Sequence, residues 1–290
     1  MKKFTLLFAL AVLMMLAAVP VRAHIFYEVK ADKATVWLLG SIHMADSSFY
    51  PMSPVVNDAF EQSNYLVTEV LMDELMSTGR EFLDSLYYPK GDSLPLHIAD
   101  TTWQRVIGCF KEYGVGRGML KKLKPSILVL TLSQLEYVKH GYSANLGMEM
   151  YFTKNAGSDK SLLQLESLDS QADLLAQMGD GEEPNKFIND AIDERGETIA
   201  MIDSIATAWK SGDADRLYEL VNKGMETDSE NEEEFNKKLL DDRNNGMSGK
   251  IIEFLQSDGK YFVIVGAAHL LGKDGLVTQL QSAGYEVVQK

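Results

Sequence analysis

Apolar and polar positions form strand-like patterns at both ends of the chain. Near the start, residues 26–30 and 35–39 carry the apolar and β-branched side chains that favour strands, and the four residues between them suit a turn. Near the end, residues 261–265 form a continuous apolar run, which is typical of a central strand. The pattern therefore predicts a hairpin at the start of the chain and a buried strand near its end.

The interval between these ends is mostly helical in its spacing. Residues 65–70 resemble a buried strand and residues 161–165 a short one, while helical periodicity dominates from about 73 to 257. A helix over 275–283 and a last strand over 285–288 follow. We predict an α/β fold, with α+β as the alternative. Its central mixed sheet is formed by the N- and C-terminal strands, with a large helical insertion or cap between them.

The first 23 residues have the pattern of a secretory signal peptide. A short basic start precedes an uncharged stretch over residues 4–19, and Val21 and Ala23 supply the small residues of a cleavage site. The stretch is shorter than the roughly 20 residues that span a bilayer. We expect cleavage after Ala23, which leaves a single domain over 24–290 in the periplasm or outside the cell, with no membrane span.

Composition limits the chemistry of this 290-residue chain. It has 28 Lys and Arg against 42 Asp and Glu, a formal net charge of −14, with no basic stripe, so we expect no nucleic-acid partner. Its single cysteine, Cys109, allows neither an intramolecular disulfide nor a cysteine-based metal site. A metal site in this chain would therefore depend on His and carboxylate ligands.

One pattern occurs twice and points to a functional site. Gly40-Ser-Ile-His43 and Gly266-Ala-Ala-His269 each follow an apolar strand. Because ligands in open α/β sheets bind beyond the carboxyl ends of the strands, we expect His43 and His269 to converge there. Such a pair suits either a divalent metal completed by carboxylates or general acid–base catalysis. The structural alternative is that each His forms only a hydrogen bond at its turn.

Three carboxylates and one arginine are the candidates to complete this site. Glu69 lies near the end of the predicted strand 65–70, Glu149 at a helix start, and Glu166 just after the strand over 161–165. Each also has a structural interpretation, as an exposed edge residue, a helix-dipole partner and a cap, respectively. Arg243 is either a clamp for an anion or oxyanion, or a partner of its acidic sequence neighbours.

Together these blocks resemble the TraB/GumN family, which is related to the Tiki proteins, the erythromycin esterases and the ChaN-like haem-binding proteins. The resemblance rests on Trp37-Leu-Leu-Gly-Ser-Ile-His43-Met, Thr68-Glu69, Leu123-Lys124-Pro125, Gly147-Met148-Glu149, Leu165-Glu166-Ser167, Arg243-Asn244 and Val265-Gly-Ala-Ala-His269. Two positions depart from the family pattern: Glu149 stands where the family usually has Asp, and Ser167 where it often has Thr.

The resemblance implies a hydrolytic pocket built from His43, Glu69 and His269, and the Tiki branch implies a metal-dependent peptidase. We expect a secreted or periplasmic hydrolase acting on a peptide or small-molecule substrate. Its expected catalytic residues are His43, Glu69, Arg243 and His269. A bound Mn, Co or Zn ion would take its ligands from His43, Glu69, Glu149, Glu166 and His269. The alternative is a non-catalytic protein that binds a peptide signal or haem in the same pocket.

Overall fold

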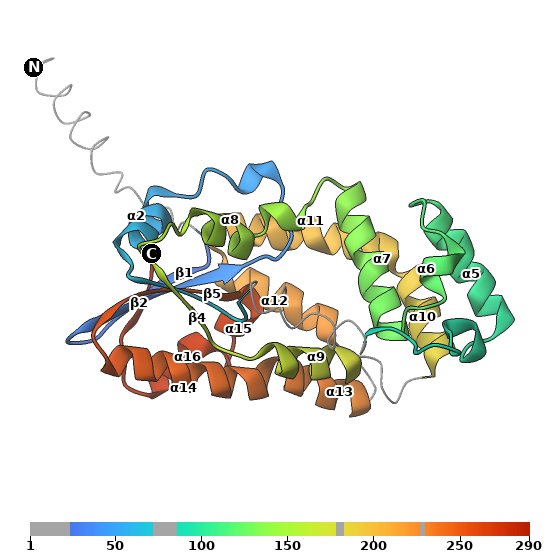
Figure 1. The fold of residues 1–290 in the computed structure, drawn as a ribbon. Helices are drawn as coiled ribbons and strands as arrows, with labels where there is room; N and C mark the ends of the chain where they lie inside the picture. Colours follow the sequence, from blue (N-terminus) through green and yellow to red (C-terminus); the bar gives the residue numbers. More distant parts are fainter. Residues whose placement is uncertain (1–23, 72–85, 178–182, 227–229) are drawn as a thin grey trace, which may run out of the picture.

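The computed structural model describes residues 24–71, 86–177, 183–226 and 230–290 (Figure 1). The predicted signal peptide over residues 1–23 and the start of the predicted helical segment, residues 72–85, lie outside the described residues. Among the helices within the described ranges, none combines the length and apolar character needed to cross a membrane.

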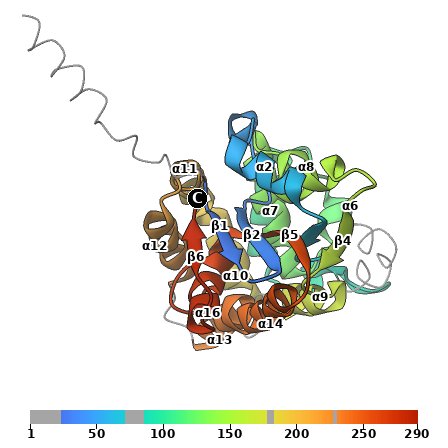
Figure 2. The same ribbon diagram turned by 90° about the vertical axis from the view of Figure 1, so that its left-hand side faces the viewer.

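A six-stranded mixed sheet lies at the centre of the molecule, in the order β4-β3-β5-β2-β1-β6 (Figures 1 and 2). The strands are β1 (Phe26–Lys30), β2 (Ala34–Ser41), β3 (Tyr65–Thr68), β4 (Ser161–Gln164), β5 (Gly259–Gly266) and β6 (Val287–Gln289). The predicted hairpin is confirmed as the antiparallel pair β1 and β2. The α/β prediction is also confirmed, and β4 is an edge strand that comes from within the mainly helical part of the chain.

Four neighbouring strands run parallel, and this brings several predicted site residues to one edge of the sheet. β5 pairs in parallel with β2 on one side and with β3 on the other, and β3 pairs in parallel with β4. In the β2–β5 register, Ser41 is opposite Gly266. The two Gly-x-x-His turns therefore leave adjacent strands at the same level, beside the ends of β3 and β4.

Helices surround the sheet. Those described are α2 (Pro54–Gln62), α5 (Asp100–Lys111), α6 (Arg117–Leu120), α7 (Pro125–Lys139), α8 (Met148–Asn155), α9 (Leu168–Gln177), α10 (Pro184–Asp193), α11 (Arg195–Ser211), α12 (Ala214–Met225), α13 (Glu230–Lys237), α14 (Arg243–Gln256), α15 (Ala267–Leu270) and α16 (Leu276–Ser282). The turns η1 (Ser47–Phe49), η2 (Leu94–Leu96) and η3 (Ala144–Leu146) are 3-10 helical, and η4 (Lys238–Asp242) is π-helical.

Opposite faces of the sheet are covered by different helices. The α2 and α8 pair covers one face, and α14 and α16 cover the other (Figures 1 and 2). Phe60 of α2 and Phe152 of α8 meet Phe262 of β5, with ring centroids 5.4 and 4.9 Å apart. On the other face, Ile251 and Leu255 of α14 are buried in the same core. The apolar run predicted at β5 is thus buried on both sides.

A second hydrophobic cluster holds α5, α6, α7 and α10 together beyond the carboxyl edge of the parallel strands (Figure 1). It includes Trp103, Phe110 and Cys109, whose free thiol is buried. Because α7 packs on α10 of this cluster and also on α11, the cluster positions α7 and α11, which face the predicted site.

Candidate functional site

The first Gly-x-x-His turn carries an imidazole that is paired with a carboxylate. His43 Nδ1 lies 2.9 Å from Glu149 Oε1, and the Ser41 hydroxyl donates to the same oxygen. Glu149 stands in the first turn of α8, whose N-cap is Gly147. A Cβ on Gly147 would lie 2.2 Å from the carbonyl oxygen of His43, so glycine is needed to bring α8 this close.

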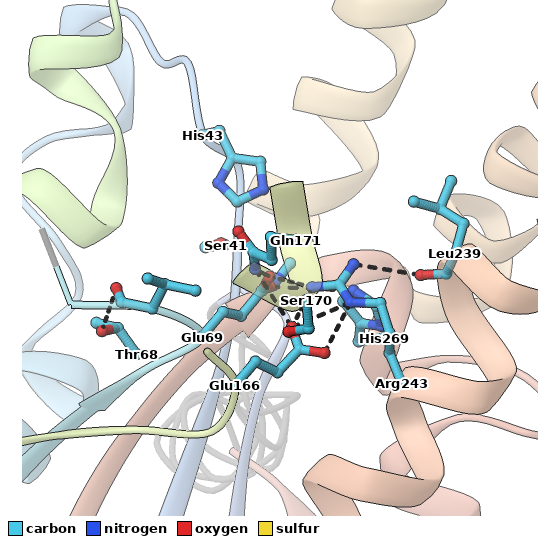
Figure 3. A network of polar contacts seen from close by, with 12 residues as sticks. Ser41, His43, Thr68, Glu69, Glu166, Ser170, Gln171, Leu239, Arg243 and His269 are labelled. Atoms are coloured by element: carbon cyan, nitrogen blue, oxygen red, sulfur yellow. Dashed lines mark hydrogen bonds and ion pairs between the residues drawn. The ribbon is translucent and has the colours of Figure 1, made fainter. Parts of the chain in front are cut away.

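A second cluster forms around the guanidinium of Arg243 (Figure 3). Arg243 Nη2 donates to Glu69 at 2.6 Å and to Glu166 at 2.5 Å, and Nε donates to Glu166 at 2.9 Å. Gln171 Nε2 donates to both carboxylates at 3.2 Å. Arg243 begins α14 directly after the π-helical turn η4, where its Nη1 donates to the Leu239 carbonyl at 3.2 Å. Such π-turns occur frequently at functional sites.

The second imidazole has its tautomer fixed by hydrogen bonds. Asn244 Nδ2 donates to the Asp274 carbonyl at 2.9 Å, which leaves Asn244 Oδ1 facing His269 Nδ1 at 2.8 Å. Since this amide oxygen only accepts, we assign the proton of the neutral ring to Nδ1. The Nε2 atom of His269 therefore carries the lone pair, and it lies 4.0 Å from Glu69 Oε1.

Gly266 lies between the two imidazoles. A Cβ placed on it would lie 3.8 Å from His43 Nε2 and 3.4 Å from both His269 Cδ2 and Glu69 Oε1. The backbone N–H of Gly266 donates to Glu69 Oε1 at 2.6 Å, which fixes this carboxylate beneath the rings. The structure thus brings His43, Glu69 and His269 around one small volume, although 226 residues separate the two imidazoles along the chain.

The two imidazoles have opposite pKa shifts. The charge and hydrogen bond of Glu149 raise the pKa of His43 to about 9, so this ring is protonated at neutral pH. Its side chain is 69% exposed, so water weakens the ion pair without changing the direction of the shift. Burial instead lowers the pKa of His269 to about 4, and this side chain is 5% exposed. At pH 7 the site therefore holds one charged and one neutral imidazole.

Glu69 remains ionised beneath these rings. Burial acts to raise its pKa, but the charges of His269, His43 and Arg243 lower it to about 2. Since His269 is neutral above about pH 4, His43 and Arg243 supply the stabilising charge at neutral pH. The pKa of Glu149 is lowered as well: burial acts against its charge, but the attraction of His43 outweighs it.

An apolar cavity of about 380 Å³ opens onto the two imidazoles. His43, Arg243, Gly266 and His269 form part of its lining, while the turns after β2 and β5 and helices α7, α11, α12 and η4 supply most of the remainder. This volume lies within the range of about 300–1,000 Å³ that is usual for small-molecule pockets. The cavity opens the site toward the helical side of the molecule.

The predicted metal ligands are close together, but their placement does not fit a coordination shell. Glu166 and one oxygen of Glu69 face Arg243, and Glu149 faces Nδ1 of His43. Within the described ranges, no three His, Cys, Asp or Glu side chains are placed to hold one metal ion. In the described part of the chain, these side chains as placed do not form a metal site.

The charged residues of the site could be predicted from the sequence, whereas three polar residues that orient them were not predicted. Ser41, Gln171 and Asn244 fix Glu149, the carboxylate pair and His269, respectively. Ser41 lies inside the first Gly-x-x-His unit and Asn244 follows Arg243, so both were within recognised sequence blocks. Nothing in the residue types alone indicates which partner each would contact.

Comparison with known proteins identifies the family of the chain. The model of the TraB/PrgY/gumN family matches residues 25–289, nearly the whole chain, so the chain belongs to this family. The resemblance found in the sequence blocks is thereby confirmed. No curated protein and no solved structure matches the chain.

Proposed function

We propose that this member of the TraB/PrgY/gumN family is a hydrolase that cleaves an ester or amide bond by acid–base catalysis between His269 and His43. The observation that carries the proposal is the pair of imidazoles beside Gly266, one buried and neutral, the other paired with a carboxylate and protonated. Two neighbouring groups whose environments separate their pKa values are suited to act as base and acid.

His269 is the general base in this proposal. Its Nδ1–H is held by Asn244, so the Nε2 lone pair is available to take a proton from a water molecule. Glu69 is positioned to orient that water through the oxygen that also accepts from Gly266. The resulting hydroxide attacks the carbonyl carbon of the substrate.

His43 is the general acid in this proposal, and Arg243 binds the carbonyl oxygen of the substrate. Glu149 holds Nδ1 of His43, and Nε2–H lies near Gly266, on the side shared with His269. The hydrogen bonds of Arg243 to described residues use four of its five N–H groups, so one Nη1–H is left for a carbonyl oxygen. Charge that develops on that oxygen is stabilised there.

The proton transfers balance over one cycle. His269 receives one proton from water, and His43 gives its Nε2 proton to the departing alcohol or amine. His269, whose pKa is about 4, then returns its proton to solvent, and His43, whose pKa is about 9, regains one. Both rings are thereby restored without another reactant.

Activity assays with matched histidine variants test the proposal. The mature chain is incubated with uncharged esters and amides, and kcat/KM is measured from pH 3.5 to 10. We expect His43→Gln and His269→Gln each to lower kcat/KM by about 10²–10⁴-fold. His97→Gln is the control, because His97 pairs with Asp92 away from the cavity, and it should keep the wild-type value.

Three results would contradict the proposal. They are wild-type rates in both site variants, no turnover of any ester or amide, or activity that is lost with a chelator and restored by Mn, Co or Zn. The last result would favour the predicted metal-dependent peptidase instead. A Soret band on addition of haem, without turnover, would favour the predicted binding protein.

We also propose that the protein acts in the periplasm or outside the cell. The basic start, the uncharged residues 4–19 and the small residues Val21 and Ala23 support this location. Fractionation of cells that express the full chain, with N-terminal sequencing, tests it. The expected first residue is His24, and an intact Met1 in the cytoplasmic fraction would contradict the proposal.

A further inference from the structure

The cavity that opens onto His43 and His269 has a wall that is largely aliphatic. Its apolar side chains include Ile202, Ile205 and Ala206 of α11, Leu217 of α12, and Leu239 and Leu240 of η4. These helices lie beyond the carboxyl edge of the sheet, opposite the strands that carry the catalytic imidazoles (Figure 1). A substrate that reaches the imidazoles therefore places part of its structure against this wall.

The charged groups of the cavity belong to the catalytic site. Among the described residues that line it, His43 and Arg243 are charged at neutral pH and His269 is neutral, while burial raises the pKa of Tyr137 and Tyr142. Within the described ranges, no Lys, Asp or Glu is part of this lining. A charged group placed against Ile202 and Ile205 would lack a partner, and burying an unpaired charge is unfavourable.

The catalytic end of the cavity does not favour an anion either. The positive charges of His43 and Arg243 are already matched by Glu149, Glu69 and Glu166, which lie behind them and outside the cavity lining. A bound carboxylate would add a further negative charge to a cluster that has no excess of positive charge. The cavity chemistry therefore fits a neutral ligand with an apolar body and a carbonyl group.

We infer that this cavity binds a neutral aliphatic acyl chain, with its carbonyl at His43 and Arg243 and its alkyl part along α11. The inference rests on the proposed hydrolase function and adds to it the class of acyl group that is cleaved. Because each buried methylene favours binding by a nearly constant amount, kcat/KM rises about fourfold per added methylene until the cavity is filled.

A series of esters with increasing acyl-chain length, assayed on wild type and on two variants in which an alanine is replaced by leucine, tests the inference. The mature chain is assayed with p-nitrophenyl esters from acetate to octanoate, which differ only in the acyl chain. Ala206 lines the cavity, so Ala206→Leu shortens it, whereas Ala200 is exposed on the same helix and Ala200→Leu is the matched control. We expect Ala206→Leu to lower the ratio of kcat/KM for octanoate to kcat/KM for acetate at least tenfold, with Ala200→Leu keeping the wild-type ratio.

Binding measured without turnover separates this inference from the hydrolase proposal. Calorimetry with octanamide, which is neutral, and with octanoate, which is charged, is done on the same three proteins in a His269→Gln background, where the proposed base is absent and the amide is not cleaved. We expect octanamide to bind at least tenfold more tightly than octanoate, and Ala206→Leu to weaken it. If no ester is cleaved but octanamide binds in this way, the acyl site stands and the hydrolase proposal fails.

The opposite pattern overturns the acyl site alone. Esters cleaved at a rate that does not depend on chain length, or an equal effect of Ala206→Leu on acetate and octanoate, would show that the alkyl chain does not enter the cavity. Equal binding of octanamide and octanoate would contradict the inferred neutrality of the ligand.

Discussion

Burial of His269 predicts how the stability of the protein depends on pH. Its pKa falls from an ordinary 6.5 to about 4 in the folded protein, because the ring is buried. In the unfolded chain the ring takes up a proton as the pH drops below 6.5, whereas in the folded protein it stays neutral until about pH 4. The unfolded state therefore binds more protons in this window, and stability is lost as the pH falls through it.

The size of this loss of stability follows from the pKa shift of His269. A change of one pKa unit corresponds to 1.36 kcal/mol, so His269 alone lowers the free energy of unfolding by about 3 kcal/mol between neutral pH and pH 4. Such a loss is a large part of the 5–15 kcal/mol that is usual for a folded domain. Neither His43 nor Glu69 obscures this window. The raised pKa of His43 stabilises the folded protein below pH 6.5, and this stabilisation is lost as the pH rises toward about 9. The lowered pKa of Glu69 stabilises it above pH 4.5, and this stabilisation is lost as the pH falls toward about 2.

Urea unfolding from pH 4 to 7.5, on wild type and His269→Gln, measures the effect. Glutamine does not titrate, so the variant should lose less stability than wild type as the pH falls, by about 3 kcal/mol at pH 4. Burial also lowers the pKa of His24, but that contribution is common to both proteins and cancels in the difference. Parallel stability curves for the two proteins would refute the assignment of a buried neutral His269.

Three further predictions concern neighbouring groups. Glu149→Gln removes the charge that raises the pKa of His43, so an NMR titration of that ring should show its pKa moving down toward 6.5; an unchanged pKa would contradict the pairing. Gly266→Ala should fold normally but lose activity, because the added Cβ makes ordinary contacts of 3.4–3.8 Å yet lies between the rings. Gly40→Ala, its matched control, should lower the melting temperature instead, because its Cβ would lie 2.8 Å from Ile25. Arg243→Met leaves two buried carboxylates without their cation and should lower the free energy of unfolding by about 3–5 kcal/mol; an unfolding curve like that of wild type would show that the cluster contributes little.

Much of the fold could be predicted because each strand has a recognisable pattern of residues over a short segment of sequence. The hairpin, the central strand β5 and the edge strand β4 were each visible as short apolar or β-branched runs. The sequence also indicated that both Gly-x-x-His units follow strands, and parallel pairing of β2 with β5 then brings them together. These predictions depend on properties of neighbouring residues, which a single sequence contains.

The pairing of charges within the site could not be predicted in the same way. Sequence placed Arg243 beside Asp241 and Asp242, but residues one or two positions apart on a helix do not face each other. The guanidinium instead reaches Glu69 and Glu166, which come from other parts of the chain. Strand-end positions indicate which carboxylates are near, whereas their orientation depends on tertiary contacts such as the approach of Gly147 to the His43 turn.

The parallel pairing of β2 with β5 also determines when the protein acquires its site during synthesis. Because His43 and His269 are 226 residues apart, a growing chain holds the first imidazole well before it holds the second. Pairing of such distant segments is a slow step in folding because a long loop must close first. The imidazole pair therefore forms only once β5 has joined the sheet, so the site is a product of long-range folding and not of either segment alone.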